Sequence, residues 1–268
     1  ASRFDDVNSV VNAGSVMLIN GVTGAQINTI AGDTAHDKLG DTSVTALGNN
    51  NFVIASGRDD VNSVVNAGSV MLINGATGAQ IDTIAGNTAD DKLGYDGVTA
   101  LGNNNFVIAS RNDDVNSVVN AGSVMLINGT TGAQINTIAG DTAHDQFGFN
   151  GVTALGNNNF VIASYWDDVN SVVNAGSVML INGATGAQIN TIEGDTLYDA
   201  LGFNGVTALG NNNFVIASRY DDVNSVTDAG SVRLINGATG AQIGAYFGGD
   251  TASDQLGSSS VTALGNNN

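Results

Sequence analysis

Residues 69–84 read Ser-Val-Met-Leu-Ile-Asn-Gly-Ala-Thr-Gly-Ala-Gln-Ile-Asp-Thr-Ile, and this stretch decides the fold. Two apolar runs rich in β-branched residues flank a short segment that contains Asn-Gly and Thr-Gly, which is the pattern of a β-hairpin. Neither run has the longer 3.6-residue apolar period of an amphipathic helix. We therefore predict two antiparallel strands joined by a tight turn.

A second hairpin follows in the same unit. Residues 97–101 (Gly-Val-Thr-Ala-Leu) and 106–110 (Phe-Val-Ile-Ala-Ser) flank the turn Gly-Asn-Asn-Asn at 102–105. The runs Val-Met-Leu-Ile and Phe-Val-Ile-Ala are apolar on both faces of a strand, so that other sheets must cover them from both sides. The unit therefore predicts one four-stranded antiparallel sheet that packs between neighbouring sheets.

The unit recurs every 54 residues over the whole chain of 268 residues. A pair of aspartates marks each copy: Asp5-Asp6, Asp59-Asp60, Asp113-Asp114, Asp167-Asp168 and Asp221-Asp222. Repetition from end to end predicts one continuous domain over residues 1–268, rather than two separate ones. Its units span approximately 1–54, 55–108, 109–162, 163–216 and 217–268.

Repeated four-stranded antiparallel sheets predict an all-β fold of the β-propeller type. A β-solenoid is the rival architecture, but the hairpin turns argue against it because they require antiparallel pairing. With one inserted residue near Gly248, the chain is three residues short of five complete units. We expect either a five-bladed ring with one interrupted strand or an open arc cut from a larger propeller.

Composition excludes several classes of partner. The chain has 7 Lys and Arg against 25 Asp and Glu, with a net charge of -18, and such a field repels nucleic acid and anionic lipid surfaces. No apolar run approaches the roughly 20 residues of a membrane-spanning helix, so no membrane insertion is expected. There is no cysteine. Acidic repeats rich in Gly, Asn and Thr are typical of secreted bacterial proteins, and we expect an extracellular or cell-surface location.

The stretch Phe-Gly-Phe-Asn-Gly-Val-Thr-Ala-Leu at 147–155, then Phe-Val-Ile-Ala-Ser at 160–164 and Ala-Gly-Ser-Val-Met-Leu at 175–180, resembles the FG-GAP repeat of integrin α-subunit-like β-propellers. The resemblance covers the whole chain. It implies that Val-Thr-Ala-Leu is the innermost strand, followed by Phe-Val-Ile-Ala, Ser-Val-Met-Leu-Ile and the outermost Gln-Ile-x-Thr-Ile. The calcium loop of that family is shortened here to Gly-Asn-Asn-Asn, which has no carboxylate for a hard cation.

Most of the variation among the copies falls at one edge of the predicted sheets. The two hairpin turns lie at one edge and are nearly invariant, whereas the loop before each Asp pair and the crossing to the next sheet lie at the other edge and vary. The aromatic and arginine residues of the variable edge are the candidate ligand-binding residues: Arg3, Phe4, Arg58, Tyr95, Arg111, Phe149, Tyr165, Trp166, Tyr198, Phe203, Arg219 and Tyr220. Such side chains provide contact area and directional hydrogen bonds. Surface loops also vary without function, and the sequence leaves both interpretations open.

Aspartates recur at the same edge, in the Asp pairs and in the crossing loops. The crossing-loop members are Asp37, Asp91, Asp145, Asp199 and Asp254. Short carboxylates cap turns by accepting backbone N–H bonds, and convergent ones bind calcium. We favour turn caps, because no copy has the ligand spacing of a known calcium loop, and we expect no cofactor.

We do not expect an enzyme. A catalytic pair of carboxylates needs two different environments, whereas repetition gives every Asp pair the same one. His36 and His144 occupy equivalent sites in the first and third units and are too far apart to share a metal. No arrangement of Ser, His and Asp and no phosphate-binding glycine loop is present.

Two functions remain for such a chain. The first is a binding or adhesion module that recognises a glycan or a protein through the variable edge. The alternative is a structural repeat protein that associates with further copies through open strand edges.

Overall fold

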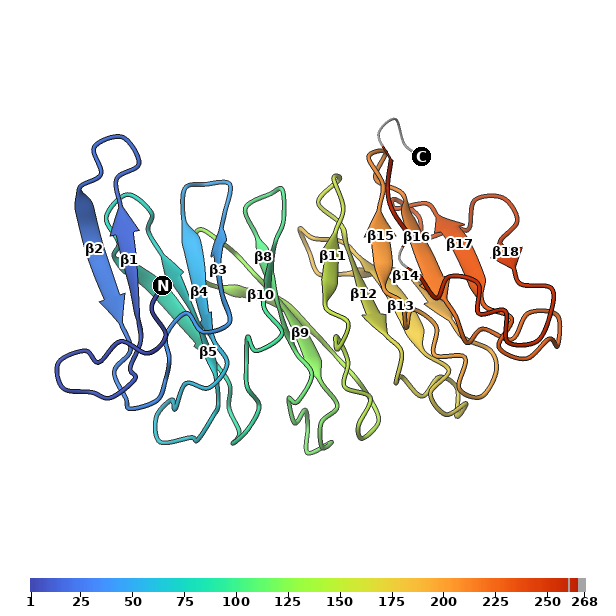
Figure 1. Ribbon diagram of the computed structural model, residues 1–268, viewed down its shortest axis with the longest axis horizontal. Helices are drawn as coiled ribbons and strands as arrows, with labels where there is room; N and C mark the ends of the chain where they lie inside the picture. The colour runs from blue at the N-terminus through green and yellow to red at the C-terminus, as the bar shows by residue number, and fades with distance from the viewer. Residues whose placement is uncertain (260, 265–268) are drawn as a thin grey trace.

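The computed structural model describes residues 1–259 and 261–264, and all of its regular structure is β (Figure 1). Five antiparallel sheets follow one another along the chain. The strands of sheet one are β1 (Ser15–Ile19) and β2 (Gln26–Ala31). Those of sheet two are β3 (Ser43–Ala46), β4 (Phe52–Ser56), β5 (Ser69–Ile73) and β6 (Gln80–Ala85). Within the described residues no helix is long and apolar enough to cross a membrane.

The other three sheets repeat this pattern. Sheet three contains β7 (Val98–Ala100), β8 (Phe106–Ser110), β9 (Ser123–Ile127) and β10 (Gln134–Ala139). Sheet four contains β11 (Val152–Ala154), β12 (Phe160–Ser164), β13 (Ser177–Ile181) and β14 (Gln188–Glu193). Sheet five contains β15 (Val206–Ala208), β16 (Phe214–Ser218), β17 (Ser231–Ile235) and β18 (Phe247–Gly248).

The predicted strand order is confirmed, because neighbours in each sheet are consecutive in sequence and pair antiparallel. Contacts between sheets join β3 to β7, β7 to β11 and β11 to β15, so the Val-Thr-Ala strands lie innermost. The sheets form an open row with sheet one and sheet five at opposite ends (Figure 1). Of the two arrangements left open by the sequence, the described residues adopt the open arc, and the antiparallel hairpins exclude a solenoid.

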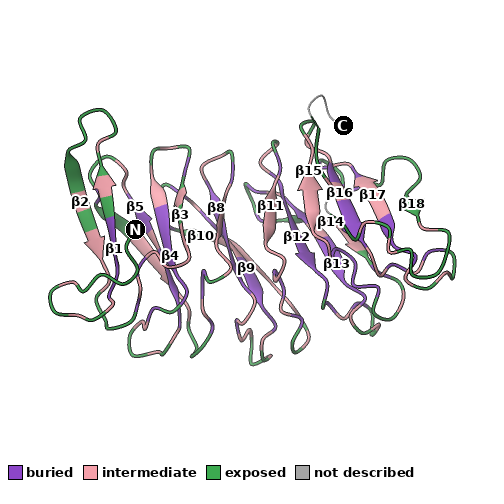
Figure 2. Cartoon of the chain, viewed as in Figure 1, coloured by how far each residue is buried: buried purple, intermediate pink, exposed green. Residues whose placement is uncertain are grey.

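The core lies between successive sheets. In the cluster between sheets three and four, Val107 and Leu126 present one apolar face and Phe160, Ile162 and Ile181 present the other. Figure 2 shows the buried residues concentrated on the middle strands β8, β9, β12 and β13, whereas β2 at the end of the row is largely exposed. Apolar area on both faces of these strands is therefore removed from water by the two neighbouring sheets.

The Gly-Asn-Asn-Asn turns of sheets two, three and four bond each of these sheets to the next. The side-chain amides of Asn103 and Asn105 donate to the carbonyl oxygen of Gly183, at 2.9 and 3.0 Å, in the β13–β14 turn of the following sheet. Gly183 has no room for a side chain, because an added Cβ would lie 1.9 Å from the carbonyl oxygen of Asn158. The same pair of bonds recurs in two further places, from Asn49 and Asn51 to Gly129 and from Asn157 and Asn159 to Gly237.

Sheet five departs from the predicted pattern. The segment equivalent to the outermost strand contains Gly244, and its pairing with β17 is reduced to Phe247–Gly248 and an isolated bridge between Gln242 and Ile235. Val261–Leu264, predicted as an innermost strand, forms none, because no partner strand lies beside it among the described residues. Ser260 and the last Gly-Asn-Asn-Asn turn, residues 265–268, lie outside the described residues.

The fastening role of the asparagines can be tested with a matched pair of variants. We expect Asn103→Ala to lower the free energy of unfolding by about 1 kcal/mol more than Asn211→Ala, because only Asn103 donates to the next sheet. Both residues accept the same bond within their own turn, at 3.2 Å, so that the difference isolates the contact between sheets. Urea unfolding measures it. Equal losses in the two variants would contradict this role.

Candidate functional site

The variable residues of the five copies lie along one edge of the row. The hairpin turns line its upper edge in Figure 1, and the loops β4–β5, β8–β9, β12–β13 and β16–β17 line its lower edge together with the crossings between sheets. We call the lower edge the loop edge. We call the boundary between sheets one and two the first junction, and the following boundaries the second, third and fourth junctions.

The structure brings most of the predicted residues of the loop edge into one continuous stack. The Arg111 guanidinium lies between the Tyr95 and Phe149 rings, with its central carbon 5.7 and 4.5 Å from their centroids. Arg111 also pairs with Asp96, whose carboxylate oxygen lies 3.4 Å from its Nε. The stack therefore begins with a cation held over two aromatic rings, a favourable arrangement.

The stack continues through aromatic rings toward sheet five. The Tyr165 ring lies 5.4 Å from that of Phe149 and 4.8 Å from that of Phe203, edge to face in both pairs. Phe203 then packs 5.2 Å from Tyr220, and Arg219 lies over both rings at 4.3 and 4.5 Å. Arg111 and Tyr165 are thus each placed between the crossing residues of two successive junctions. We call this series the aromatic ladder: Tyr95, Arg111, Phe149, Tyr165, Phe203, Arg219 and Tyr220.

Arg3, Phe4 and Arg58 do not join the aromatic ladder. They lie at the first junction, where Arg3 pairs with Asp41 at 2.9 Å and covers the Phe4 ring at 4.7 Å. Arg58 lies 3.9 Å from the same carboxylate. A surface ion pair contributes little to stability, and this end of the loop edge is polar rather than aromatic.

The fourth junction contains an open surface pocket that we call the aromatic hollow. It has a volume of about 290 Å³ and is lined by the rings of Tyr165, Trp166, Tyr198, Phe203 and Tyr220, together with Asn174, Ala200 and Asp228. Tyr165 is the buried aromatic residue of this lining that has a hydroxyl, and burial raises the pKa of its phenol. Trp166 packs on Tyr165 at 4.9 Å and, like Tyr198, stays well exposed.

Sequence reasoning identified the five rings but missed the other three lining residues. Ala200 takes the place of Lys38, Lys92, Gln146 and Gln255 in the other copies, and Asp228 takes the place of an asparagine. A position-by-position comparison of the copies reveals both of these replacements. The signal is weak, because neither an alanine nor one more aspartate is conspicuous in an acidic, alanine-rich chain.

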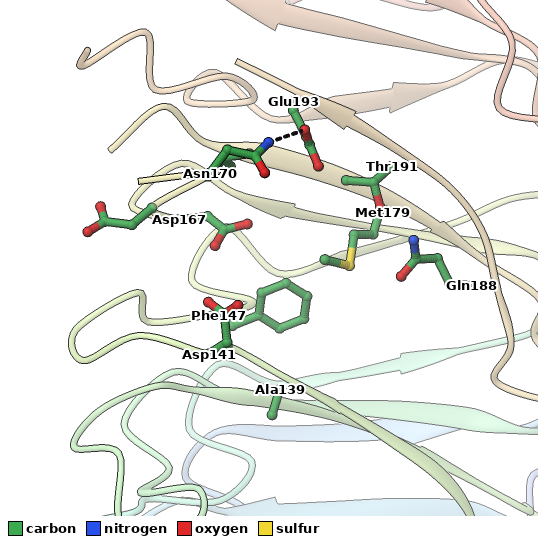
Figure 3. A pocket seen from close by; sticks show the side chains of 12 residues that line it. Ala139, Asp141, Phe147, Asp167, Asn170, Met179, Gln188, Thr191 and Glu193 are labelled. Carbon is green, nitrogen blue, oxygen red and sulfur yellow. Dashed lines mark hydrogen bonds between the residues drawn. The ribbon is translucent and has the colours of Figure 1, made fainter. Parts of the chain in front are cut away.

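A second, acidic pocket of about 310 Å³ lies at the third junction (Figure 3). Asp141, Asp167 and Glu193 face it beside Phe147 and Met179, and the Asn170 amide donates to Glu193 at 3.1 Å. Carboxylate oxygens converge within 4.8 Å in three such sets: Asp33, Asp37 and Asp59; Asp141, Asp145 and Asp167; Asp195, Asp199 and Asp221. The sequence did not predict that these residues from separate loops would meet.

Most of these carboxylates accept hydrogen bonds from the chain itself. Asp37 accepts bonds from the Thr34 backbone N–H, at 2.6 Å, and from the Thr34 hydroxyl. Asp6 accepts the Asn12 N–H at 2.7 Å, and its counterparts in the other copies repeat this bond. The geometry of turn caps is therefore present at the recurring aspartates.

Burial makes two carboxyls of these sets weaker acids. It raises the pKa of Asp59 to about 6 and that of Asp167 to about 6, although the hydroxyls of Ser69 and Ser177 donate to them. At the fourth junction the chain supplies its own cation. Arg233, which replaces a methionine found in the other copies, lies 2.7 Å from the Asp221 carboxylate.

Comparison with known proteins gives a family for the repeat. The family described as a repeat of unknown function (DUF5650) matches residues 46–95, 100–149, 154–192 and 208–245, which is more than half of the chain. The chain belongs to this family. The matches begin 54 residues apart, as the predicted period requires. Membership of the FG-GAP family stays a prediction.

Among solved structures, BamB from Moraxella catarrhalis is similar to the DUF5650 chain with a TM-score of 0.44 and 16% sequence identity. The match covers 91% of this chain and 61% of that protein, so the chain spans less than two thirds of its length. No curated protein matches the sequence.

Calcium removal tests the interpretation of the aspartates as turn caps. We expect EDTA to shift the melting temperature by less than about 2 °C, because donors of the chain already occupy many of the carboxylate lone pairs. If calcium did bind, a concentration a hundredfold above its dissociation constant would add about 2.7 kcal/mol to the free energy of unfolding and raise the melting temperature by several degrees. A large drop in EDTA that calcium reverses and magnesium does not would contradict the prediction.

Proposed function

We propose that the chain is a non-enzymatic binding module, displayed outside the cell, that recognises a glycan or a protein through the aromatic hollow on its loop edge. The observation that carries this proposal is the convergence of five aromatic rings from three separate loops on one small space. Small ligand sites are concave and largely apolar, with a few polar groups that orient the ligand.

Two features support a binding role over simple covering of the junction. Trp166 and Tyr198 are 39% and 58% exposed, although they stand beside the buried Tyr165. At the other three junctions no more than two of the five equivalent positions are Phe, Tyr or Trp, so stability does not require this set of rings. Exposed aromatic residues around a concave space are typical of contact sites for partners.

Binding can be tested with variants matched by position in the repeat. We expect Trp166→Ala and Tyr198→Ala to weaken capture on a glycan array or in a pull-down at least about tenfold, because each removes one wall of the hollow. Arg58→Ala and His144→Ala change the equivalent positions at other junctions and should leave capture intact. If Trp166→Ala retains full binding, this site is not the ligand site.

Self-association is a second candidate function, and one observation favours it. Met17 and Ile19 on the outer face of sheet one are each 52% exposed, whereas Ile73, Ile127 and Ile181 are fully buried against the preceding sheet. At the other end of the row, the facing residues of sheet five, Val215, Val232 and Leu234, are only partly buried. The exposed face of sheet one and that of sheet five carry the same apolar positions that pack together at the inner junctions. The two faces therefore suit head-to-tail contact between copies of the chain.

Light scattering over a range of protein concentrations tests this candidate. We expect the average mass to rise with concentration, and Ile19→Lys to keep the chain monomeric because it places a charge in the proposed contact. Val22→Lys, at a turn residue that is 96% exposed, serves as the control and should associate normally. A wild-type chain that stays monomeric at the highest concentration would rule the contact out.

A further inference from the structure

We infer that the aromatic hollow binds a methylated ammonium group, and this inference rests on the proposed binding function. The chain offers an internal comparison, since four junctions are built from nearly identical copies of one unit. The pocket lined by five aromatic rings lies at the fourth, whereas the pocket at the first is lined by Arg3, Asp41, Thr42, Arg58 and Tyr95. The residues that differ at the fourth junction indicate the chemistry of the ligand.

At the first junction, the positions equivalent to the aromatic hollow hold an ammonium group of the chain itself. There Phe4 stands where the fourth junction has Trp166, and Lys38 stands where it has Ala200. The Lys38 ammonium lies over the Phe4 ring, 5.7 Å from its centroid. Because the equivalent residue at the fourth junction is an alanine, the space above Trp166 is not filled by a cation of the chain itself.

Other changes at the fourth junction also suit a cation. Asp228 replaces the asparagine of the other copies and places the single carboxylate in the lining of the hollow. Within the described part of the chain, no Lys or Arg lies within ion-pairing distance of it. Arg219 contacts Phe203 and Tyr220 but does not line the hollow. Aromatic faces with one carboxylate attract positive charge.

The scarcity of polar groups favours a methylated ammonium over a primary one. A primary ammonium loses its strong hydration on burial, whereas the lining of the hollow is mostly apolar. Its polar groups are those of Asn174, Asp228 and the tyrosine hydroxyls, and the Tyr220 hydroxyl already accepts a bond from Arg219 at 2.6 Å. Methyl groups spread the charge and pack against ring faces, as in aromatic cages for choline and methyl-lysine. The volume of the hollow, about 290 Å³, is at the small end of the range for ligand sites and suits a group of the size of choline.

The only tryptophan of the chain, Trp166, lines the hollow, so that its fluorescence reports on binding directly. We expect choline to cause a saturable change in fluorescence. Its neutral isostere 3,3-dimethylbutan-1-ol should bind at least about tenfold more weakly, because it has the shape of choline without the charge. Phosphocholine and a peptide with trimethyl-lysine distinguish a choline-bearing ligand from a methylated protein.

Variants of the lining test how much the charge of the site contributes to choline binding. Asp228→Asn should weaken choline binding several-fold, and Asn120→Asp, the reverse change at another junction, should have no effect. Ala200→Lys should abolish binding by returning an internal ammonium to the site. The backbone allows it, because Ala200 and Lys38 share a left-handed conformation with φ of 48° and 53°. Melting temperatures verify that each variant is folded.

The outcomes distinguish this inference from the proposed function. Any of three results would overturn the inference: choline and the isostere bind equally, neither of them binds, or Ala200→Lys binds choline as well as the wild type does. If glycan or protein capture then still depends on Trp166 and Tyr198, the binding function stands with a different ligand. If choline binds as expected and no larger ligand does, the module recognises the free headgroup.

Discussion

Each sheet of this chain depends on its neighbour to cover an apolar face. The middle strands carry large side chains on both faces, and in sheets three and four all of these except Met125 and Met179 are buried, because two flanking sheets lie against them. A single sheet of this kind would leave much of that apolar area in water, at roughly 25 cal/mol for each Å². The unit is therefore stable as a member of a row, and repetition is a physical requirement of such a strand pattern.

This requirement limits where the copies can differ. The strands must fit the faces of two neighbours, and the Gly-Asn-Asn-Asn turns must reach a glycine carbonyl of the next sheet, so both are nearly the same in every copy. The loop edge is free of these contacts at many positions. Differences there accumulate at corresponding places in successive junctions, and the regular spacing of the sheets stacks them into the aromatic ladder.

The same geometry also concentrates negative charge. Aspartates that end one sheet meet an aspartate from the next, within 4.8 Å at three junctions. At two of them the raised pKa of Asp59 and Asp167 records the burial of a carboxyl that prefers to be neutral. At the fourth junction Arg233 supplies a positive charge instead. Equivalent sites in one row thus offset the repulsion between neighbouring carboxylates in different ways, by a raised pKa at two junctions and by an arginine at the fourth.

The sequence by itself determined the strands, their order within each sheet and the edge on which variation collects. These features follow from local information: apolar runs bounded by Asn-Gly and Gly-Asn-Asn-Asn turns, repeated with a constant period. Twelve candidate residues at the loop edge could be named in this way, although it could not be known which of them touch. The short outer strand of sheet five escaped prediction because an inserted residue and Gly244 alter its pairing locally.

Only the tertiary structure decided which loop residues meet. Whether Trp166, Ala200 and Asp228 line one hollow depends on how sheet five packs against sheet four, and residues so far apart in sequence carry no local signal of it. The open row, the convergence of the aspartates and the reach of Asn103 to Gly183 are likewise properties of the junctions. A repeat pattern specifies the unit, whereas the packing angle between units, set by side chains on two faces at once, specifies the site.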